Sequence, residues 1–238
     1  MGKKKQAIIL CSGGLDSTVT AYHVKSLKKY NKIIILFFNY NQKSLIQERK
    51  FSKLTARSLN ADFIEIKLNE LNKISTSLIN IKGKTQKVGK ADLKDTKKES
   101  KKWYVPCRNL IFISYALAFA DSSFMKYKNS SDIFLGFKCE GNDSYPDTTQ
   151  DFVNQMNKLS KLSTESKSKI LVPLIKMDKE DIINLGKKLN VNFKKTFSCY
   201  SPRNNIHCGI CLACALRKYG FYWSGIKDPT SYTRQESS

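Results

Sequence analysis

Apolar and polar residues alternate along the first part of the chain in a way that predicts strands and helices in turn. Residues 6–11 form a short apolar run that ends at two glycines, which is typical of a buried parallel strand. From residue 16 or 17 to about residue 30, apolar side chains follow helical spacing. A second apolar run, a further helix and a third strand are expected at 32–39, around 43–60 and around 62–66. This alternation predicts an α/β fold with a Rossmann-like, doubly wound parallel sheet.

The pattern is interrupted once and then resumes. Residues 69–102 are rich in Lys, Ser, Asn and Thr and have little apolar periodicity, which predicts either a polar lid or loop or a plain disordered insertion. Later elements are expected as a buried helix at 107–120, strands at 132–137 and 170–174, and a helix at about 179–189 behind the N-cap Asp178. Because the sequence has no internal repeat and no Pro-rich linker, a single domain over residues 1–238 is the simplest partition.

Amino-acid composition raises the question of whether the chain binds nucleic acid. The chain has 42 Lys and Arg against 20 Asp and Glu, a formal charge of +22, which is compatible with nucleic-acid binding. The excess is mostly Lys spread along the chain, which favours a solvated basic surface, so we do not expect dedicated nucleic-acid binding. No run of about 18 apolar residues occurs, and the N-terminus leads directly into a strand. We therefore expect a cytoplasmic protein that does not enter a membrane.

The glycine turn after the first strand has the features of a phosphate-binding loop. Residues 12–17 read Ser-Gly-Gly-Leu-Asp-Ser and lead into a helix. Glycines let backbone N–H groups approach an anion closely, and the start of a helix adds the positive end of its dipole. Ser12 and Ser17 offer hydroxyl groups, whereas Asp16 could bind Mg²⁺ or cap the helix. A helix cap without a ligand is the structural alternative.

Cysteines are concentrated near the C-terminus. Four of the seven, Cys199, Cys208, Cys211 and Cys214, fall within sixteen residues. Two successive two-residue spacers allow one turn to supply three thiolates, with the fourth coming from across a loop. Four thiolates leave no open coordination position, so we expect a structural Zn²⁺ site within about 196–221. An iron–sulfur cluster is the competing interpretation, and His207 could replace one ligand.

The remaining cysteines are interpreted differently. Cys11, Cys107 and Cys139 are isolated in the sequence, and isolated cysteines are more often small buried residues than metal ligands or nucleophiles.

With its loop placed directly after the first strand, the sequence resembles the PP-loop ATP pyrophosphatases, a superfamily that cleaves ATP between the α- and β-phosphates. The loop lacks the Gly-Lys-Ser/Thr ending of a Walker motif. The resemblance implies an adenine nucleotide alpha hydrolase-like fold and ATP as cosubstrate. It implies that the cofactor-binding residues are Cys11, Ser12, Gly13, Gly14, Leu15, Asp16, Ser17 and Thr18.

Further motifs narrow the resemblance to one family. They are Tyr-Asn-Gln-Lys at 40–43, Val-Pro-Cys-Arg-Asn-Leu-Ile-Phe at 105–112, Tyr-Pro-Asp at 145–147, Pro-Leu-Ile-Lys-Met-Asp-Lys at 173–179, Ser-Cys-Tyr at 198–200, and Cys-Gly-Ile-Cys-Leu-Ala-Cys-Ala-Leu-Arg at 208–217. In this order they resemble the 7-cyano-7-deazaguanine synthase family of queuosine-precursor biosynthesis, which suggests a homodimer.

The resemblance implies a ligase reaction that uses ATP and Mg²⁺. The carboxylate of 7-carboxy-7-deazaguanine is adenylated and captured by ammonia as an amide, and a second ATP activates the amide so that elimination leaves a nitrile. The catalytic residues it implies are Asp16, Ser17, Arg108 and Lys179, the last two as phosphate partners. The substrate-binding residues it implies are Gln42, Arg108, Asn109, Glu140, Tyr145 and Asp147. A surface salt bridge is the structural alternative for Arg108 and for Lys179.

The sequence departs from the family pattern near the expected base site. Residues 140–149 read Glu-Gly-Asn-Asp-Ser-Tyr-Pro-Asp-Thr-Thr, where the family has a Cys-Arg pair at the last two positions. Asn41 and Lys43 replace a Gly and an Arg, and Lys cannot reproduce the fork of Arg. An enzyme that passes the adenylated acid to a protein or another amine is therefore an alternative. A PP-loop tRNA-modifying enzyme with Cys107 and Cys139 as its cysteine pair, and a non-catalytic zinc module, are the others.

Overall fold

The computed structural model describes residues 5–80, 85, 87–88, 97–138 and 145–233. The strands are β1 (Lys5–Leu10), β2 (Lys32–Asn39), β3 (Asp62–Lys67), β4 (Ser130–Phe134) and β5 (Lys169–Leu171). The helices are α1 (Leu15–Ser26), α2 (Leu45–Leu59), α3 (Asn69–Ile74), α4 (Lys97–Trp103), α5 (Arg108–Tyr127), α6 (Gln150–Ser163), α7 (Lys179–Lys188) and α8 (Leu212–Trp223), with 3₁₀ turns at Pro146–Thr148 and Phe193–Lys195.

The strands form one parallel sheet in the order β3-β2-β1-β4-β5. β2 and β3 lie on one side of β1, and β4 and β5 lie on the other, so the strand order reverses at β1. Ligands of open parallel sheets bind outside the carboxyl ends of the strands at such a reversal. The predicted doubly wound α/β fold is confirmed. The glycine loop that follows β1 lies at this reversal point.

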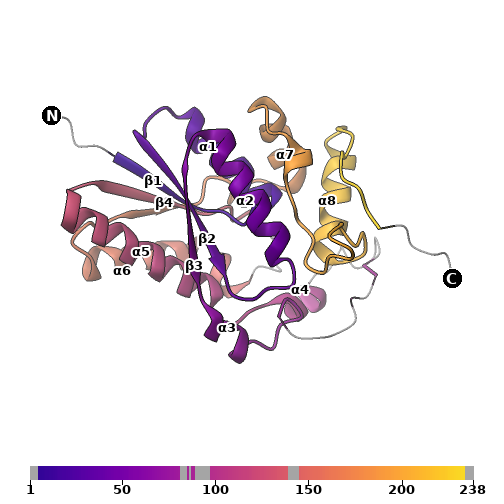
Figure 1. Cartoon of the computed structure of the whole chain (residues 1–238), viewed down its shortest axis with the longest axis horizontal. Coiled ribbons are helices and arrows are strands. Elements are labelled where there is room, and N and C mark those ends of the chain that lie inside the picture. Colours follow the sequence, from indigo (N-terminus) through magenta and orange to yellow (C-terminus); the bar gives the residue numbers. More distant parts are fainter. Residues whose placement is uncertain (1–4, 81–84, 86, 89–96, 139–144, 234–238) are drawn as a thin grey trace.

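Alternating side chains of the central strands divide the core into two layers. On β1, Ile8 and Leu10 belong to the cluster that packs against α5 and α6, whereas Ala7 and Ile9 belong to the cluster under α1 and α2. Figure 1 shows these helix pairs on opposite faces of the sheet, with α7 and α8 gathered beside α1 and α2. Both faces of the strands are buried, which explains their nearly continuous apolar sequence.

Helix α5 corrects the expectation of a helix that is buried all round. Ile113 and Ala116 are fully buried against the sheet, but Leu110 is 36% exposed and Tyr115 is 46% exposed. The helix covers the sheet from one side only, so its opposite face meets solvent although it carries apolar residues. Within the described residues, no helix combines the length and apolar character required to cross a bilayer.

The described parts of 69–102 pack against the rest of the chain. They include α3 and α4, and they bury Leu71, Ile79 and Val88 in the large cluster under α5. The backbone N–H of Val88 donates to the carbonyl oxygen of Ile210 at 3.0 Å, close to the cysteine cluster. These residues do not hang in solvent, and whether the segment closes over a ligand stays a prediction.

Candidate active site and cysteine cluster

The phosphate loop is shaped by close packing against α2. Gly13 has φ +74°, and a Cβ at this position would lie 2.5 Å from the backbone nitrogen of Ser52. The Ser12 hydroxyl accepts a hydrogen bond from the N–H of Gly14 at 3.3 Å. Gly14 is the N-cap of α1 and provides no side-chain cap. The first turn of α1 therefore presents backbone N–H groups that an anion can accept.

Most of the predicted loop residues line one cavity with a volume of about 290 Å³, namely Cys11, Ser12, Gly14, Leu15, Asp16 and Ser17. Gly13 is covered by α2. Burial raises the pKa of the Cys11 thiol, so that this side chain is a neutral wall residue. Thr18 corrects the expectation, because its hydroxyl faces Thr55 at 3.3 Å between α1 and α2 and its N–H donates to the carbonyl of Gly14.

Two helix N-termini meet at the entrance of the cavity. The Nζ atom of Lys179, the first residue of α7, lies 2.7 Å from each carboxylate oxygen of Asp16. Asp178 is the N-cap of α7, as the sequence predicts. Lys179 and Asp16 both line the cavity. Lys179 therefore forms a salt bridge, as the structural alternative predicted, but the salt bridge lies inside the predicted site. There the ammonium of Lys179 and the carboxylate of Asp16 can also contact a bound nucleotide.

Helix α8 leaves room for the stem of Lys179. A Cβ on Gly220 would lie 2.2 Å from Cγ of Lys179. We predict that Gly220→Ala displaces this lysine and lowers ATP-dependent turnover roughly 10-fold while metal content is unchanged. Steady-state kinetics and metal analysis provide the measurement. In a Lys179→Ala background, which lacks Cγ, the same substitution should add little; an equal further loss would contradict the packing argument.

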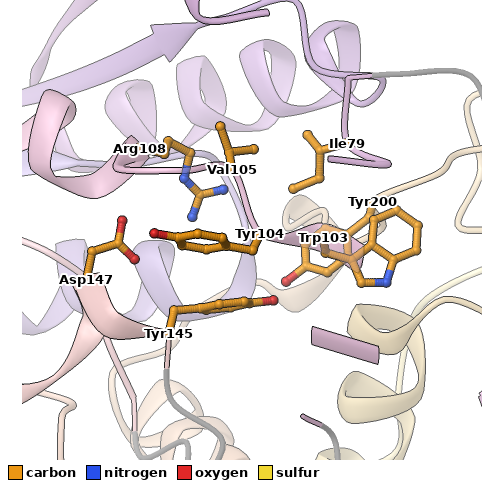
Figure 2. A pocket seen from close by; sticks show the side chains of 8 residues that line it. All are labelled: Ile79, Trp103, Tyr104, Val105, Arg108, Tyr145, Asp147 and Tyr200. Atoms are coloured by element: carbon orange, nitrogen blue, oxygen red, sulfur yellow. The ribbon is translucent and has the colours of Figure 1, made fainter. Parts of the chain in front are cut away.

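A small pocket beside the cavity is built around the start of α5; Tyr104 and Asp147 line it, and it shares Arg108 and Tyr145 with the cavity. Figure 2 shows the guanidinium of Arg108 above the ring of Tyr104, with Asp147 beside it and Tyr145 below. The rings of Tyr104 and Tyr145 are stacked with centroids 5.5 Å apart. Arg108 lies 3.5 Å from the Tyr40 hydroxyl, and burial raises the pKa of Tyr40 to about 12. A cation and protonated hydroxyl therefore face the same space.

Asn109 and Asp147 hold each other. The backbone N–H of Asn109 donates to the Asp147 carboxylate at 3.0 Å, and its side-chain amide donates to the Asp147 carbonyl at 3.2 Å. Both residues are buried. The pair fixes the 3₁₀ turn at Pro146–Thr148 to the start of α5. Asn109 lines the cavity and accepts hydrogen bonds from Arg108 at 3.3 Å, whereas Asp147 does not line it.

Gln42 lies behind the cavity wall. Its amide nitrogen donates to the Phe38 carbonyl at 3.2 Å and to Glu48 at 2.8 Å, and its amide oxygen accepts from the N–H of Tyr40 at 3.0 Å. The cavity is lined instead by Ser44 and Glu48, which the sequence motifs did not single out. Glu140 lies outside the described residues, as does Cys139.

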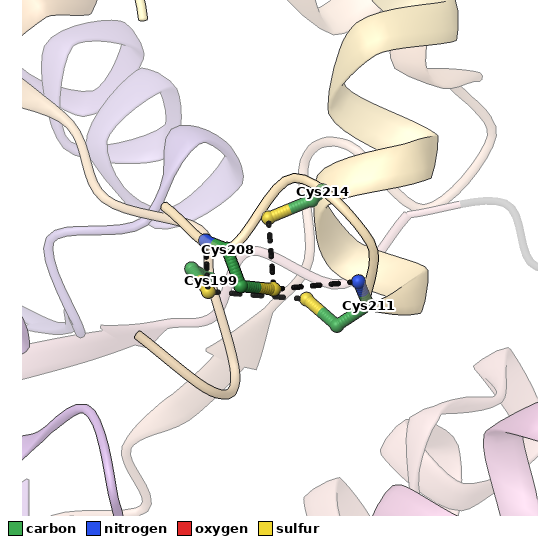
Figure 3. Close-up of side chains that lie close together, drawn as sticks. All are labelled: Cys199, Cys208, Cys211 and Cys214. Carbon is green, nitrogen blue, oxygen red and sulfur yellow. Dashed lines mark hydrogen bonds between the residues drawn. The ribbon is translucent and has the colours of Figure 1, made fainter. Parts of the chain in front are cut away.

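The four C-terminal cysteines converge. All four are buried, and their sulfur atoms lie within 4.8 Å of one another (Figure 3). The Cys208–Cys214 and Cys211–Cys199 sulfur pairs are each 4.0 Å apart. A tetrahedron with Zn–S bonds of about 2.3 Å has edges of about 3.8 Å, so this cluster fits one tetrahedral metal ion.

The other candidates near the cluster have different positions. His207 is no substitute ligand, because its Nε2 accepts the N–H of Ser198 at 3.1 Å; burial, with the charge of Arg217, lowers its pKa to about 3. Cys107 is exposed, contrary to expectation, because it occupies a left-handed N-cap with φ 56° at the start of α5.

The cysteine region is connected to the phosphate loop through Arg217, which is 1% exposed. Its guanidinium donates to the hydroxyls of Thr196 and Ser198 at 2.9 and 3.2 Å. The intervening Phe197 donates its N–H to the carbonyl of Gly13 at 2.8 Å. The cysteine region is thereby connected to Phe197 and Ser198, which line the cavity.

A parallel sheet with a Ser-Gly-Gly loop at its reversal point defines an α/β protein of the PP-loop class. A family model described as queuosine biosynthesis protein QueC matches residues 6–225. A 7-cyano-7-deazaguanine synthase from Methanococcus maripaludis is 38% identical, covering 95% of this chain and 98% of that protein. One from Pyrococcus abyssi is 32% identical, covering 96% and 97%. The chain belongs to the QueC family of queuosine biosynthesis proteins.

Among solved structures, the U34-tRNA thiolase NcsA from Methanococcus maripaludis aligns with a TM-score of 0.45 and 14% identity, over 91% of this chain and 64% of that chain. That likeness is too distant to bear on activity.

Proposed function

We propose that the chain converts 7-carboxy-7-deazaguanine and ammonia to 7-cyano-7-deazaguanine at the expense of two ATP molecules. The supporting observation is one cavity that joins the phosphate loop to an inner pocket around Arg108, in a chain that matches 7-cyano-7-deazaguanine synthases over nearly its whole length. Nothing in the comparisons favours the macromolecular acceptor or the tRNA-modifying alternatives.

The residues at the two ends of the cavity would divide the work. In the first stage, the substrate carboxylate attacks the α-phosphorus of ATP and releases pyrophosphate; ammonia then displaces AMP and forms the amide with loss of a proton. The N–H groups at the start of α1, with Ser12 and Ser17, would hold phosphate oxygens. Lys179 and Arg108 would neutralise charge that builds on the leaving pyrophosphate.

In the second stage, the amide oxygen attacks a second ATP, pyrophosphate leaves, and loss of AMP with the remaining amide protons leaves the nitrile. The same phosphate contacts serve both stages, since both make an adenylate. Bound Mg²⁺ would supply positive charge beside the phosphates, and Asp16, which lines the cavity, would hold it.

We also propose that the cysteine cluster holds structural Zn²⁺. The short sulfur–sulfur distances favour a single ion, because each cysteine of a [4Fe–4S] cluster binds a different iron and the sulfurs are spread further apart. Four thiolates leave no position for a reacting water. Metal analysis of the purified protein should give one zinc per chain, and iron with sulfide would contradict this assignment.

A homodimer in the cytoplasm completes the proposal. The supporting observation is apolar surface on α5 and α6, where Met125 is 63% exposed and Leu162 is 86% exposed. Light scattering after size exclusion should give twice the mass of the chain, and a monomer at micromolar concentration would contradict the dimer.

The activity is tested by incubating the protein with ATP, Mg²⁺, ammonium and 7-carboxy-7-deazaguanine and following products by mass spectrometry. We predict that amide accumulates first and nitrile follows, with one AMP released at each stage. Reactions without the acid are the control and should release no AMP. If AMP release depends on the acid but neither amide nor nitrile forms, another amine is the acceptor. Without any acid-dependent AMP, the proposed ligase function fails.

A further inference from the structure

Glu48 is a carboxylate in the inner cavity to which neither the motifs nor the proposed reaction assigns a task. It lies in the first turn of α2, and its side chain lines the cavity together with Tyr40, Arg108 and Phe112. Among the described residues, no cationic nitrogen lies within 4.0 Å of its carboxylate oxygens. An anion in such a position needs hydrogen-bond donors, because burial of an unpaired charge is costly.

Two neighbouring side chains donate hydrogen bonds to this carboxylate. The amide of Gln42 donates to Oε2 at 2.8 Å, and the hydroxyl of Ser44 donates to Oε1. Burial raises the pKa of Glu48, and the hydrogen bonds from Ser44 and Gln42 and the charge of Arg108 oppose this rise in part. A carboxylate oxygen can accept two hydrogen bonds. Each oxygen thus keeps one acceptor position.

Aromatic side chains line the same cavity as Glu48. The ring of Phe112 is stacked on Phe38 with centroids 4.1 Å apart, and Tyr40 meets Phe112 edge-on at 5.5 Å. Aromatic walls with a polar group at one end suit a planar heterocycle whose edge donates hydrogen bonds. The phosphate loop, Asp16 and Lys179 line the same cavity.

We infer that Glu48 is the residue that selects the guanine-type ring, accepting hydrogen bonds from the ring N1–H and the 2-amino group. This inference rests on the proposed function and names the part of the substrate that one side chain binds. The reacting carboxyl group is on the five-membered ring, away from the N1 edge, so binding by Glu48 leaves it free to face the phosphate loop. Gln42 acts as a positioning residue through Glu48.

The same contact would keep the two substrates in their own places. An adenine ring presents a bare N1 acceptor at the corresponding edge, and two acceptors facing each other repel. Sites that hydrogen-bond a substrate reject analogues that lack the donor, because buried polar groups are then left unpaired. Glu48 therefore disfavours ATP in the inner cavity and accepts the deazaguanine acid.

The test is a cycle between a protein variant and a substrate analogue. Glu48→Gln is compared with the unaltered protein, using 7-carboxy-7-deazaguanine and its analogue without the 2-amino group. We expect the unaltered protein to lose roughly 10- to 100-fold in kcat/KM with the analogue. Glu48→Gln should lose a similar factor with the parent acid but little more with the analogue. The KM values for ATP and ammonium should stay within twofold.

The controls separate this contact from general damage. Glu70→Gln, which alters an exposed carboxylate of α3 paired with Lys73, should behave like the unaltered protein. If Glu48→Gln lowered kcat/KM by the same factor for both acids, the inference would be overturned. A rise in the ammonium KM, which would assign Glu48 to the amine, or a fall in melting temperature with unaltered kinetics would also overturn it.

Binding of the two acids without ATP, measured by calorimetry, separates this inference from the proposed reaction. If the protein binds the acid but does not turn it over, the proposed function fails, while the cycle of Kd values still decides the role of Glu48. If the unaltered protein binds both acids equally, the Glu48 inference fails even where the nitrile is formed.

Discussion

Cys208→Ser is expected to lower the melting temperature by roughly 10 °C or more, and removal of the metal with a chelator should do the same. Four buried sulfur atoms lie within 4.8 Å of one another, and a metal ion bound by all four would link residue 199 to the turn before α8. Metal binding to such sites is folding free energy, and a loss of several kcal/mol corresponds to about 2–4 °C per kcal/mol in a chain of this size.

The loss should extend to the phosphate loop. Cys211 is the N-cap of α8, and Arg217 on that helix holds the hydroxyls of Thr196 and Ser198 under the loop. Without the metal, this support is weakened. We therefore expect AMP release to fall at temperatures where the sheet is still folded, as measured by circular dichroism and kinetics in parallel.

Cys107→Ser is the matched control, because Cys107 is an exposed cysteine outside the cluster. It should leave the melting temperature and the metal content unchanged. If Cys208→Ser keeps the melting temperature within about 2 °C, metal binding by the cluster does not stabilise the fold.

The strands were predictable where apolar runs are buried on both faces. The run at 6–11 and the glycine turn correspond to β1 and the loop before α1. The fourth strand was placed too far along, at 132–137, because its apolar residues continue after the pairing ends. β5 pairs only with Asp132 to Phe134, and beyond them the chain passes under the phosphate loop, where a Cβ on Gly136 would lie 2.9 Å from the nitrogen of Ser17.

Four helices were not predicted, namely α3, α4, α6 and α8. The first two lie within 69–102, whose polar composition predicted a lid or loop, and the other two were missed for reasons of packing. Helix α6 buries Val153, Met156 and Ser160, so a polar residue occupies one of its core positions and weakens the apolar period. Helix α8 begins directly after the turn that contains Cys208 and Cys211, and cysteines in such a turn do not predict a helix. Its burial depends on contacts with α7 that are distant in sequence.

The candidate site was predictable as a set of segments but less so as a set of side chains. The motif at 40–43 correctly indicated a segment next to the cavity, yet Gln42 turns behind the wall and Glu48 turns inward. Which of these two side chains faces the cavity depends on the left-handed turn at Asn41, with φ 57°, which directs the chain into α2. Sequence spacing alone does not encode that direction.

Loss of either member of the Asp16–Lys179 pair is expected to lower acid-dependent AMP formation by about 10²- to 10³-fold. Lys179→Met removes a cation from the phosphate site and leaves the Asp16 carboxylate without this partner. Asp16→Ala should raise the Mg²⁺ concentration needed for half-maximal rate. Because both residues are proposed to act on the same leaving pyrophosphate, the double variant should lose much less than the product of the two factors.

The melting temperatures of the Asp16 and Lys179 variants distinguish a functional role of this pair from a structural one. The side chains of Lys179 and Asp16 are 15% and 27% exposed, and partly solvated ion pairs contribute about 0–1 kcal/mol, so both variants should melt within about 3 °C of the unaltered protein. Lys187→Met, at the far end of α7, is the matched control and should keep full activity. If Asp16→Ala or Lys179→Met retains more than about a tenth of the rate, that residue does not stabilise the transferring phosphate, since such contacts are worth far more.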